Sequence, residues 1–232
     1  MIKMRLPKEI IYEIYSHLGN TDKRRLRQTS SLYDIKFKEK PLVEELLEDG
    51  YDIPEKYYRY YIYPIVQYGR LDIIGKIKIK KLCTIAAQYG QLNILIWAHE
   101  NGYDWDKETV MYAAEGHLDC LKYLHEHGCP WDKRTCFYAS EGYLDCLKYL
   151  HEHGCPWDKR TCYYAANGYV ECLKYAHEHG CPWDESICRN AAQGRLDCLK
   201  YARENGCPWD KWSCRYVAKK YPDCLKYIEE ND

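Results

Sequence analysis

Residues 119–136 read DCLKYLHEHGCPWDKRTC, and the same letters recur unchanged from Asp145 to Cys162. The tryptophan of this stretch belongs to a series with a period of 26 residues, at Trp105, Trp131, Trp157, Trp183 and Trp209. Two glycine series keep the same period, one from Gly90 to Gly194 and the other from Gly102 to Gly206. A fixed period of this length indicates a repeat architecture, and the unchanged stretch indicates recent tandem duplication.

One unit of the repeat predicts two short helices. Asp132 can cap the first helix, because its carboxylate accepts hydrogen bonds from amides that the first turn leaves unpaired. Gly142 is expected to end that helix. The second helix then presents an apolar stripe formed by Leu144, Leu147 and Leu150. Gly154 is expected to supply a left-handed C-cap.

A helix pair of this size cannot bury its apolar face alone, so adjacent copies must stack and share a core. The sequence therefore predicts an all-α, helix-pair solenoid. We expect degenerate copies over residues 41–82, regular repeats over residues 83–210 and a C-terminal capping repeat over residues 211–232. In the last copy Lys220 stands where the repeat glycine is expected.

The run from Gly116 to Asp132, GHLDCLKYLHEHGCPWD, resembles the second half of an ankyrin repeat, G-H-x-x-V-V-x-x-L-L-x-x-G-A-x-x-N. It departs from that pattern at His125, which replaces the second leucine, and its period is shorter than the family's period of about 33 residues. The resemblance implies an ankyrin-type solenoid that binds other proteins. Shortened repeats with G-C-P-W-D are also similar to the large ankyrin families of giant DNA viruses of amoebae and of some protists, which implies a viral protein.

The first forty residues share nothing with the repeat. Their pattern L-P-x-E-I-x-x-x-I-x-x-x-L begins at Leu6 and predicts a short amphipathic helix with proline in its first turn. The pattern resembles an F-box, which implies a small helical module over residues 1–40 that docks on the Skp-type adaptor of a cullin-RING ubiquitin ligase. By position, the adaptor-binding residues would be Leu6, Pro7, Ile10, Ile14 and Leu18. The alternative is a helical cap of the solenoid without an adaptor.

Charge and composition limit the classes of partner. The chain has 34 Lys and Arg residues against 35 Asp and Glu residues, a formal net charge of -1. No overall electrostatic field attracts nucleic acid or a membrane surface, and we expect neither as a partner. No apolar run approaches the roughly 18 residues of a membrane span. No signal peptide precedes the 14 cysteines. We therefore expect an intracellular, cytoplasmic protein with reduced thiols. We also expect a monomer.

The motif His125-Glu126-His127-Gly128-Cys129 is the strongest candidate for metal binding. Two histidines separated by one residue point about 200° apart on a helix, so they cannot easily share one ion. The sequence also lacks a phosphate-binding glycine loop, a nucleophile elbow and an H-E-x-x-H motif. We therefore predict no metal site, no cofactor and no enzymatic activity, and keep a metal-binding repeat protein as an alternative.

Positions that vary between repeats are the candidates for partner contact. One series lies five residues before each repeat glycine or its equivalent: Met111, Phe137, Tyr163, Arg189 and Arg215. A second directly follows the glycine: His117, Tyr143, Tyr169 and Arg195. In the ankyrin fold these positions line the concave face, and tyrosine and arginine are enriched in binding hot spots. The alternative is drift at exposed sites without function.

These patterns together favour a non-enzymatic substrate adaptor that links an unidentified protein target to a ubiquitin ligase. The alternative is an ankyrin-repeat binding protein without a ligase link.

Overall fold

A computed structural model describes residues 62–63, 66–69, 71–75 and 79–231 of the chain. The chain divides between Asp52 and Ile53, and every described residue belongs to the second part. All regular elements within the described ranges are helices. The F-box-like module expected over residues 1–40, with its five predicted adaptor-binding residues and its boundary with the array, lies outside the described residues.

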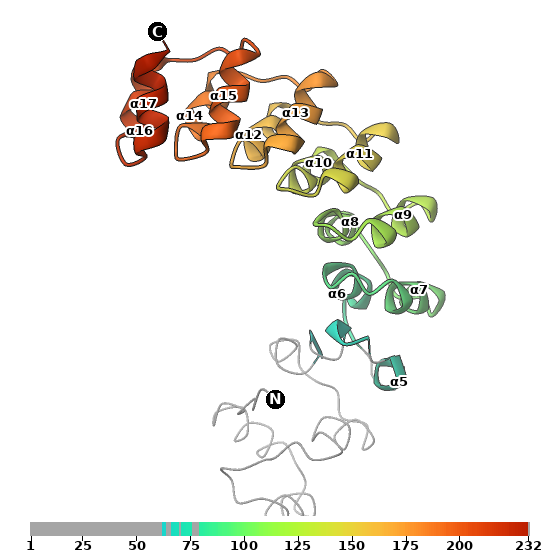
Figure 1. The fold of residues 1–232 in the computed structure, drawn as a ribbon. Helices are drawn as coiled ribbons and strands as arrows, with labels where there is room; N and C mark the ends of the chain where they lie inside the picture. The colour runs from blue at the N-terminus through green and yellow to red at the C-terminus, as the bar shows by residue number, and fades with distance from the viewer. Residues whose placement is uncertain (1–61, 64–65, 70, 76–78, 232) are drawn as a thin grey trace, which may run out of the picture. The chain divides into compact units, whose positions relative to one another are not determined.

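The helices from α6 onward come in pairs, one pair to each repeat (Figure 1). The first helices of the pairs are α6 (Leu82–Gln88), α8 (Lys107–Ala114), α10 (Lys133–Ala139), α12 (Lys159–Ala165), α14 (Glu185–Ala191) and α16 (Lys211–Ala218). The second helices are α7 (Leu92–Glu100), α9 (Leu118–Glu126), α11 (Leu144–Glu152), α13 (Val170–Glu178), α15 (Leu196–Glu204) and α17 (Pro222–Glu230). A short helix, α5 (Leu71–Ile74), precedes them.

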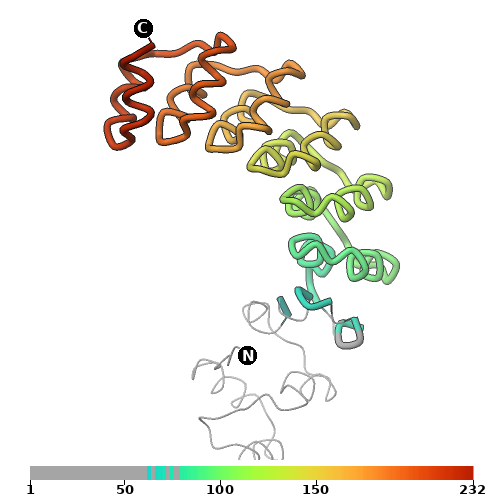
Figure 2. The backbone as a smooth tube through the Cα atoms, viewed as in Figure 1, coloured from blue at the N-terminus to red at the C-terminus, as the bar shows by residue number. Residues whose placement is uncertain are grey.

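The pairs stack into two rows. Each first helix contacts the first helix of the next repeat, and each second helix contacts the next second helix. We call these the first-helix row and the second-helix row; Figure 2 shows the backbone running back and forth between them. The predicted all-α helix-pair solenoid is confirmed for the described residues.

Local capping chemistry sets where the helices begin and end. The Asp132 carboxylate accepts a hydrogen bond from the Arg134 amide at 2.9 Å, which confirms the predicted N-cap of α10. Asp106 caps α8 more completely, because Thr109 also accepts a hydrogen bond from the Asp106 amide and closes a capping box. After α11, Gly154 has a φ of +76°, which confirms the left-handed C-cap.

Small side chains fill the space between repeats. Fully buried alanine or serine residues end each first helix from α8 to α12, where they let the neighbouring backbones approach closely: Ala113, Ala114, Ala139, Ser140, Ala165 and Ala166. In the second helices, residues such as Leu147 are completely buried, and each such leucine contributes about 2 kcal/mol of hydrophobic stabilisation.

All fourteen cysteines are buried and have free thiols. Those in the loops between repeats also link one repeat to the next. The Cys129 thiol donates to the carbonyl oxygen of Asp106 at 3.4 Å, and the Cys155 thiol donates to that of Asp132 at 3.5 Å. Burial raises the pKa of Cys129 to about 12. These thiols therefore act as small, weakly polar core residues.

In the part of the chain that the structure describes, no helix combines the length and the apolar composition that crossing a membrane requires.

Candidate protein-interaction surface

The exposed aromatic side chains of the array are confined to the first-helix row and the turns that follow its helices. Within residues 79–231, the large hydrophobic side chains that are exposed are Tyr143, Tyr163, Tyr169, Trp212 and Tyr216. The first helices also differ in sequence from repeat to repeat, for example KRTCFYA in α10 and ESICRNA in α14. Exposure and variation therefore coincide on this row.

The second-helix row is nearly constant, and its side chains hold the repeats together. Helices α9 and α11 have the same sequence, LDCLKYLHE. The ring of Trp131 stacks on His125 with centroids 4.1 Å apart. A hydrogen bond of 2.9 Å then joins Nδ1 of His125 to the hydroxyl of Tyr149 in the next repeat. The same contacts recur around His99, His151 and His177, so packing explains why these histidines recur. In the following repeat Arg203 takes the place of the histidine, and its guanidinium lies 3.9 Å from the centre of the Trp209 ring.

The histidines of neighbouring repeats approach one another along this row. The rings of His125 and His153 are 5.2 Å apart between centroids. Burial lowers the pKa of His125, and the charge of His153 lowers it further. Among the described residues, no group of three or more His, Cys, Asp or Glu side chains has an arrangement that could hold a metal ion.

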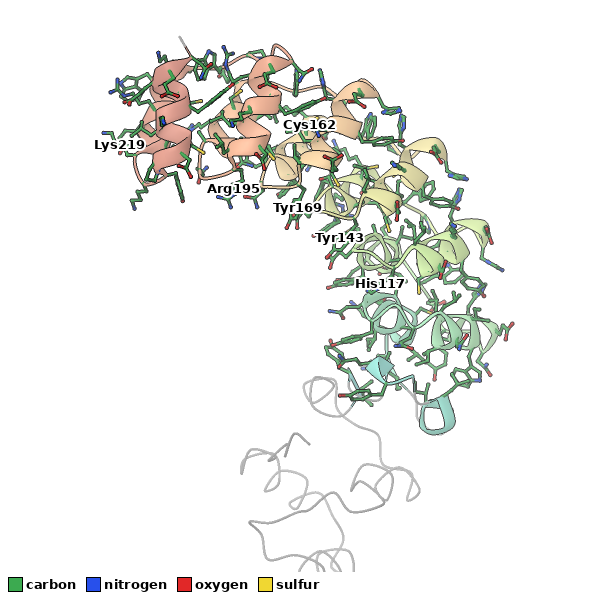
Figure 3. All side chains as sticks on the ribbon, viewed as in Figure 1. His117, Tyr143, Cys162, Tyr169, Arg195 and Lys219 are labelled. Carbon is green, nitrogen blue, oxygen red and sulfur yellow. The ribbon has the colours of Figure 1, made fainter. Side chains whose placement is uncertain are left out.

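The residues that follow the repeat glycines lie in succession along one side of the array, as the labels of His117, Tyr143, Tyr169 and Arg195 show in Figure 3. Each reaches back to the preceding repeat. His117 Nε2 donates to the carbonyl oxygen of Gln88 at 3.0 Å, and Arg195 Nε donates to that of Asn167 at 3.2 Å. These four predicted contact residues therefore also join repeats. Tyr143 and Tyr169 nevertheless keep 39% of their surface exposed, enough for contact with a partner.

The series five residues before the glycine has mixed surroundings. Met111 is half-buried, and Arg189 and Arg215 are exposed. Tyr163 is 38% exposed, whereas Phe137 is only 9% exposed. The five predicted positions therefore share a place on the first-helix row but not an accessible surface.

Contacts with the next repeat bury Phe137. Its ring stacks on that of Tyr164 with centroids 5.0 Å apart, and the guanidinium of Arg160 lies 5.3 Å from its ring centre. Phe137 therefore serves mainly as a packing residue.

Residues directly before the repeat glycines change from acidic to basic along the array. Burial raises the pKa of Glu115, and the neighbouring Glu141 carboxylate raises it further. At the other end of the row the corresponding residue is Lys219, whose ammonium lies 5.0 Å from the centre of the Tyr216 ring. The chemical character of the first-helix row therefore differs between its two ends.

Sequence reasoning missed the most exposed pair of the row. Trp212 is 73% exposed and Tyr216 is 60% exposed, and their rings stack with centroids 5.8 Å apart on α16. A signal was present, because the positions equivalent to Trp212 hold Glu108, Arg134, Arg160 and Ser186. That position varies as strongly as the chosen series.

Comparisons with known proteins agree with this architecture. Residues 83–161 match the family model described as ankyrin repeats (3 copies). A search of the curated proteins found no match. Among solved structures, the chain is similar to the human ASB11 ankyrin repeat domain, with a TM-score of 0.60 and 15% identity over 74% of this chain and 97% of that one.

A second solved structure is the pentatricopeptide repeat protein PPR10 in complex with an 18-nt psaJ RNA element. It matches with a TM-score of 0.35 and 12% identity over 97% of this chain and 38% of that one. The helix pairs, the matched family model and the first of these two structures lead to one conclusion. Over residues 83–161 this chain is similar to ankyrin repeats, and its stacked helix pairs have the fold of an ankyrin-repeat solenoid.

Proposed function

We propose that this chain is a non-enzymatic substrate adaptor that links a target protein to a cullin-RING ubiquitin ligase. The observation that carries the target-binding half of the proposal is the confinement of exposed, variable aromatic residues to the first-helix row. Tyr163 and Trp212 are side chains of the kind that dominate binding energy when a partner covers them. A constant second-helix row and a variable first-helix row are what a binding scaffold requires.

The ligase-binding half rests on the F-box-like pattern of residues 1–40. Leu6, Pro7, Ile10, Ile14 and Leu18 have the spacing of one apolar helix face and would insert into the Skp-type adaptor. The likeness of the G-C-P-W-D repeats to those of giant DNA viruses supports a viral protein that acts as a monomer inside the host cell.

Co-purification with a Skp-type adaptor tests the ligase link. The wild-type chain is expected to retain the adaptor, and a Leu6→Ala, Pro7→Ala double variant is expected to lose it, because both apolar contacts are removed. An Arg189→Glu, Arg215→Glu variant of the array is the matched control and should bind the adaptor like the wild type. If the folded wild-type chain does not bind, the ligase link is wrong and an ankyrin-repeat binding protein without that link remains.

A further inference from the structure

The last two repeats give the first-helix row a basic end. Residues 185–195 and 211–221 carry six basic side chains and one acidic side chain: Arg189, Arg195, Lys211, Arg215, Lys219 and Lys220 against Glu185. The equivalent residues of the second and third helix pairs, 107–117 and 133–143, carry three basic and three acidic side chains: Lys107, Lys133 and Arg134 against Glu108, Glu115 and Glu141. An acidic partner is therefore favoured at α14 and α16 and not at α8 and α10.

Aspartates neutralise the basic residues at the other end of the row. Ion pairs join Lys107 and Arg134 to Asp132 at 3.7 Å and 3.1 Å, and Lys133 to Asp158 at 3.4 Å. These aspartates are the helix N-caps, so the pairs belong to the repeat itself. The basic side chains there add little to the charge that a partner meets.

The basic residues of α14 and α16 have fewer acidic neighbours. Arg215 pairs with the exposed Glu229 of α17 at 2.9 Å. Arg189 lies near Asp210, whose pKa is lowered chiefly by hydrogen bonds from Ser213. Neither Arg189 nor Lys219 forms an ion pair with any described residue. Positive charge at this end is therefore available to a partner.

An apolar platform lies among these charges. Trp212 and Tyr216 stack on one face of α16, and Lys219 covers one side of the Tyr216 ring. The Trp212 side chain is 73% exposed, whereas the residue equivalent to it in α14 is a serine. A large exposed aromatic ring beside basic side chains can hold an apolar side chain of a partner while the basic residues hold its carboxylates.

We propose that Arg189, Trp212, Arg215, Tyr216 and Lys219, together called the α14–α16 surface, dock an acidic segment of a target protein that carries an apolar or aromatic side chain. This inference rests on the scaffold function proposed above and names the chemistry of its partner. Carboxylates of the segment pair with Arg189, Arg215 and Lys219. Its apolar side chain packs on Trp212, where burial of both groups adds affinity.

A protein segment fits this surface better than a nucleic acid does. Binding of a single strand requires a basic groove that follows the phosphate backbone and a succession of aromatic rings. Here the basic residues outside the last two repeats include Lys107, Lys133 and Arg134, which pair with aspartates. Glu115 and Glu141 also lie on that part of the row, where phosphates would be repelled. The formal net charge of the whole chain is -1.

Fluorescence anisotropy of the full-length protein with labelled probes tests the proposal. The probes are a glutamate-rich peptide with a central phenylalanine, the same peptide with lysine in place of glutamate, and a thymidine single strand. The glutamate peptide is expected to bind. The Arg189→Glu, Arg215→Glu variant and the Trp212→Ala variant are each expected to weaken it by about tenfold or more, and the Arg189→Lys, Arg215→Lys variant to retain most of the affinity.

The matched control is a Lys122→Glu, Lys200→Glu variant, which changes the charge of the chain by the same amount on the second-helix row. It should change affinity by less than about twofold at physiological salt. Equal weakening by this control, equal binding of the lysine peptide or tighter binding of the thymidine strand would each overturn the proposal. Thermal unfolding of every variant verifies that the array is folded.

Failure of this inference can be distinguished from failure of the scaffold function. A target protein that binds the wild type and the Arg189→Glu, Arg215→Glu variant equally well would leave the scaffold intact and exclude the α14–α16 surface. Retention of the Skp-type adaptor by the same variant tests the ligase link independently, because that contact is assigned to residues 1–40.

Discussion

The ring of Tyr143 lies directly over the backbone of Gly116 in the preceding repeat. A Cβ atom built on Gly116 would come within 2.7 Å of the tyrosine ring carbon Cδ1. Tyr169 has the same relationship to Gly142, where the distance is 2.9 Å. Gly116 and Gly142 are therefore required for two reasons: their positive φ and the aromatic ring that the next repeat places against each of them.

Two alanine substitutions separate these reasons. Gly142 and Gly168 have similar backbone conformations, with φ of +111° and +122°, but Gly168 faces only Arg195, whose Cγ would lie 3.5 Å from the new Cβ. Both variants carry the backbone strain, and only Gly142→Ala adds a steric clash. We expect Gly142→Ala to lower the free energy of unfolding by about 1–3 kcal/mol more than Gly168→Ala, as measured by urea denaturation.

A double variant provides the control for this comparison. Tyr169→Ala removes the ring that the new Cβ would meet. The loss of unfolding free energy caused by Tyr169→Ala should therefore be smaller in the Gly142→Ala background than in the wild type. Equal losses of stability for the two glycine variants would show that backbone conformation alone is responsible.

Thr135 is expected to respond to substitution in the opposite sense to Thr109. The Thr135 hydroxyl is buried and has no hydrogen-bond partner among the described residues, whereas the Thr109 hydroxyl bonds the Asp106 amide and the Thr84 hydroxyl. Thr135→Val keeps the shape and removes an unpaired polar group, so stability should stay the same or rise by about 1 kcal/mol. Thr109→Val should lower it by about 1 kcal/mol. Chemical denaturation measures the free energy of unfolding of both variants. If Thr135→Val lowered it as much as Thr109→Val does, the Thr135 hydroxyl would not be an unpaired group.

The histidines that stack on the tryptophans should make the array less stable in mild acid. Burial lowers the pKa of His125 and of His151 below the ordinary value of 6.5, with a further contribution from the neighbouring histidine of the next repeat. The unfolded chain therefore takes up these protons more readily than the folded chain does. The stabilisation is complete above pH 6.5 and is lost as the pH falls through 6.5 towards the folded pKa values.

Urea denaturation at pH 7.5 and pH 5.5 measures this loss. The decrease in stability between the two pH values should become smaller in a His125→Gln, His151→Gln variant. It should persist in His127→Gln, because His127 is exposed and contacts the backbone oxygen of Tyr123 in its own helix. An identical decrease in both variants would assign the pH dependence to other groups.

Part of the candidate surface followed from the sequence and part did not. Comparison of the repeats singled out Tyr163, Arg189 and Arg215 as candidate partner contacts, and all three lie on the first-helix row. It could not separate Tyr163 from Phe137, which occupies the same position but is buried, because the difference arises from the residue that the next repeat places against each ring. It also missed Trp212 and Tyr216, whose exposure depends on their neighbours around α16.

The sequence by itself determined the period, the helix pairs and their ends, because these depend on local chemistry. An aspartate at the N-cap and a glycine with positive φ act within a few residues of the helix that they terminate. Only the tertiary structure decided the roles of residues that meet across repeats. His125 bonds Tyr149, 24 positions away, and Gly116 accommodates Tyr143, 27 positions away, because stacking brings together side chains that no local pattern relates.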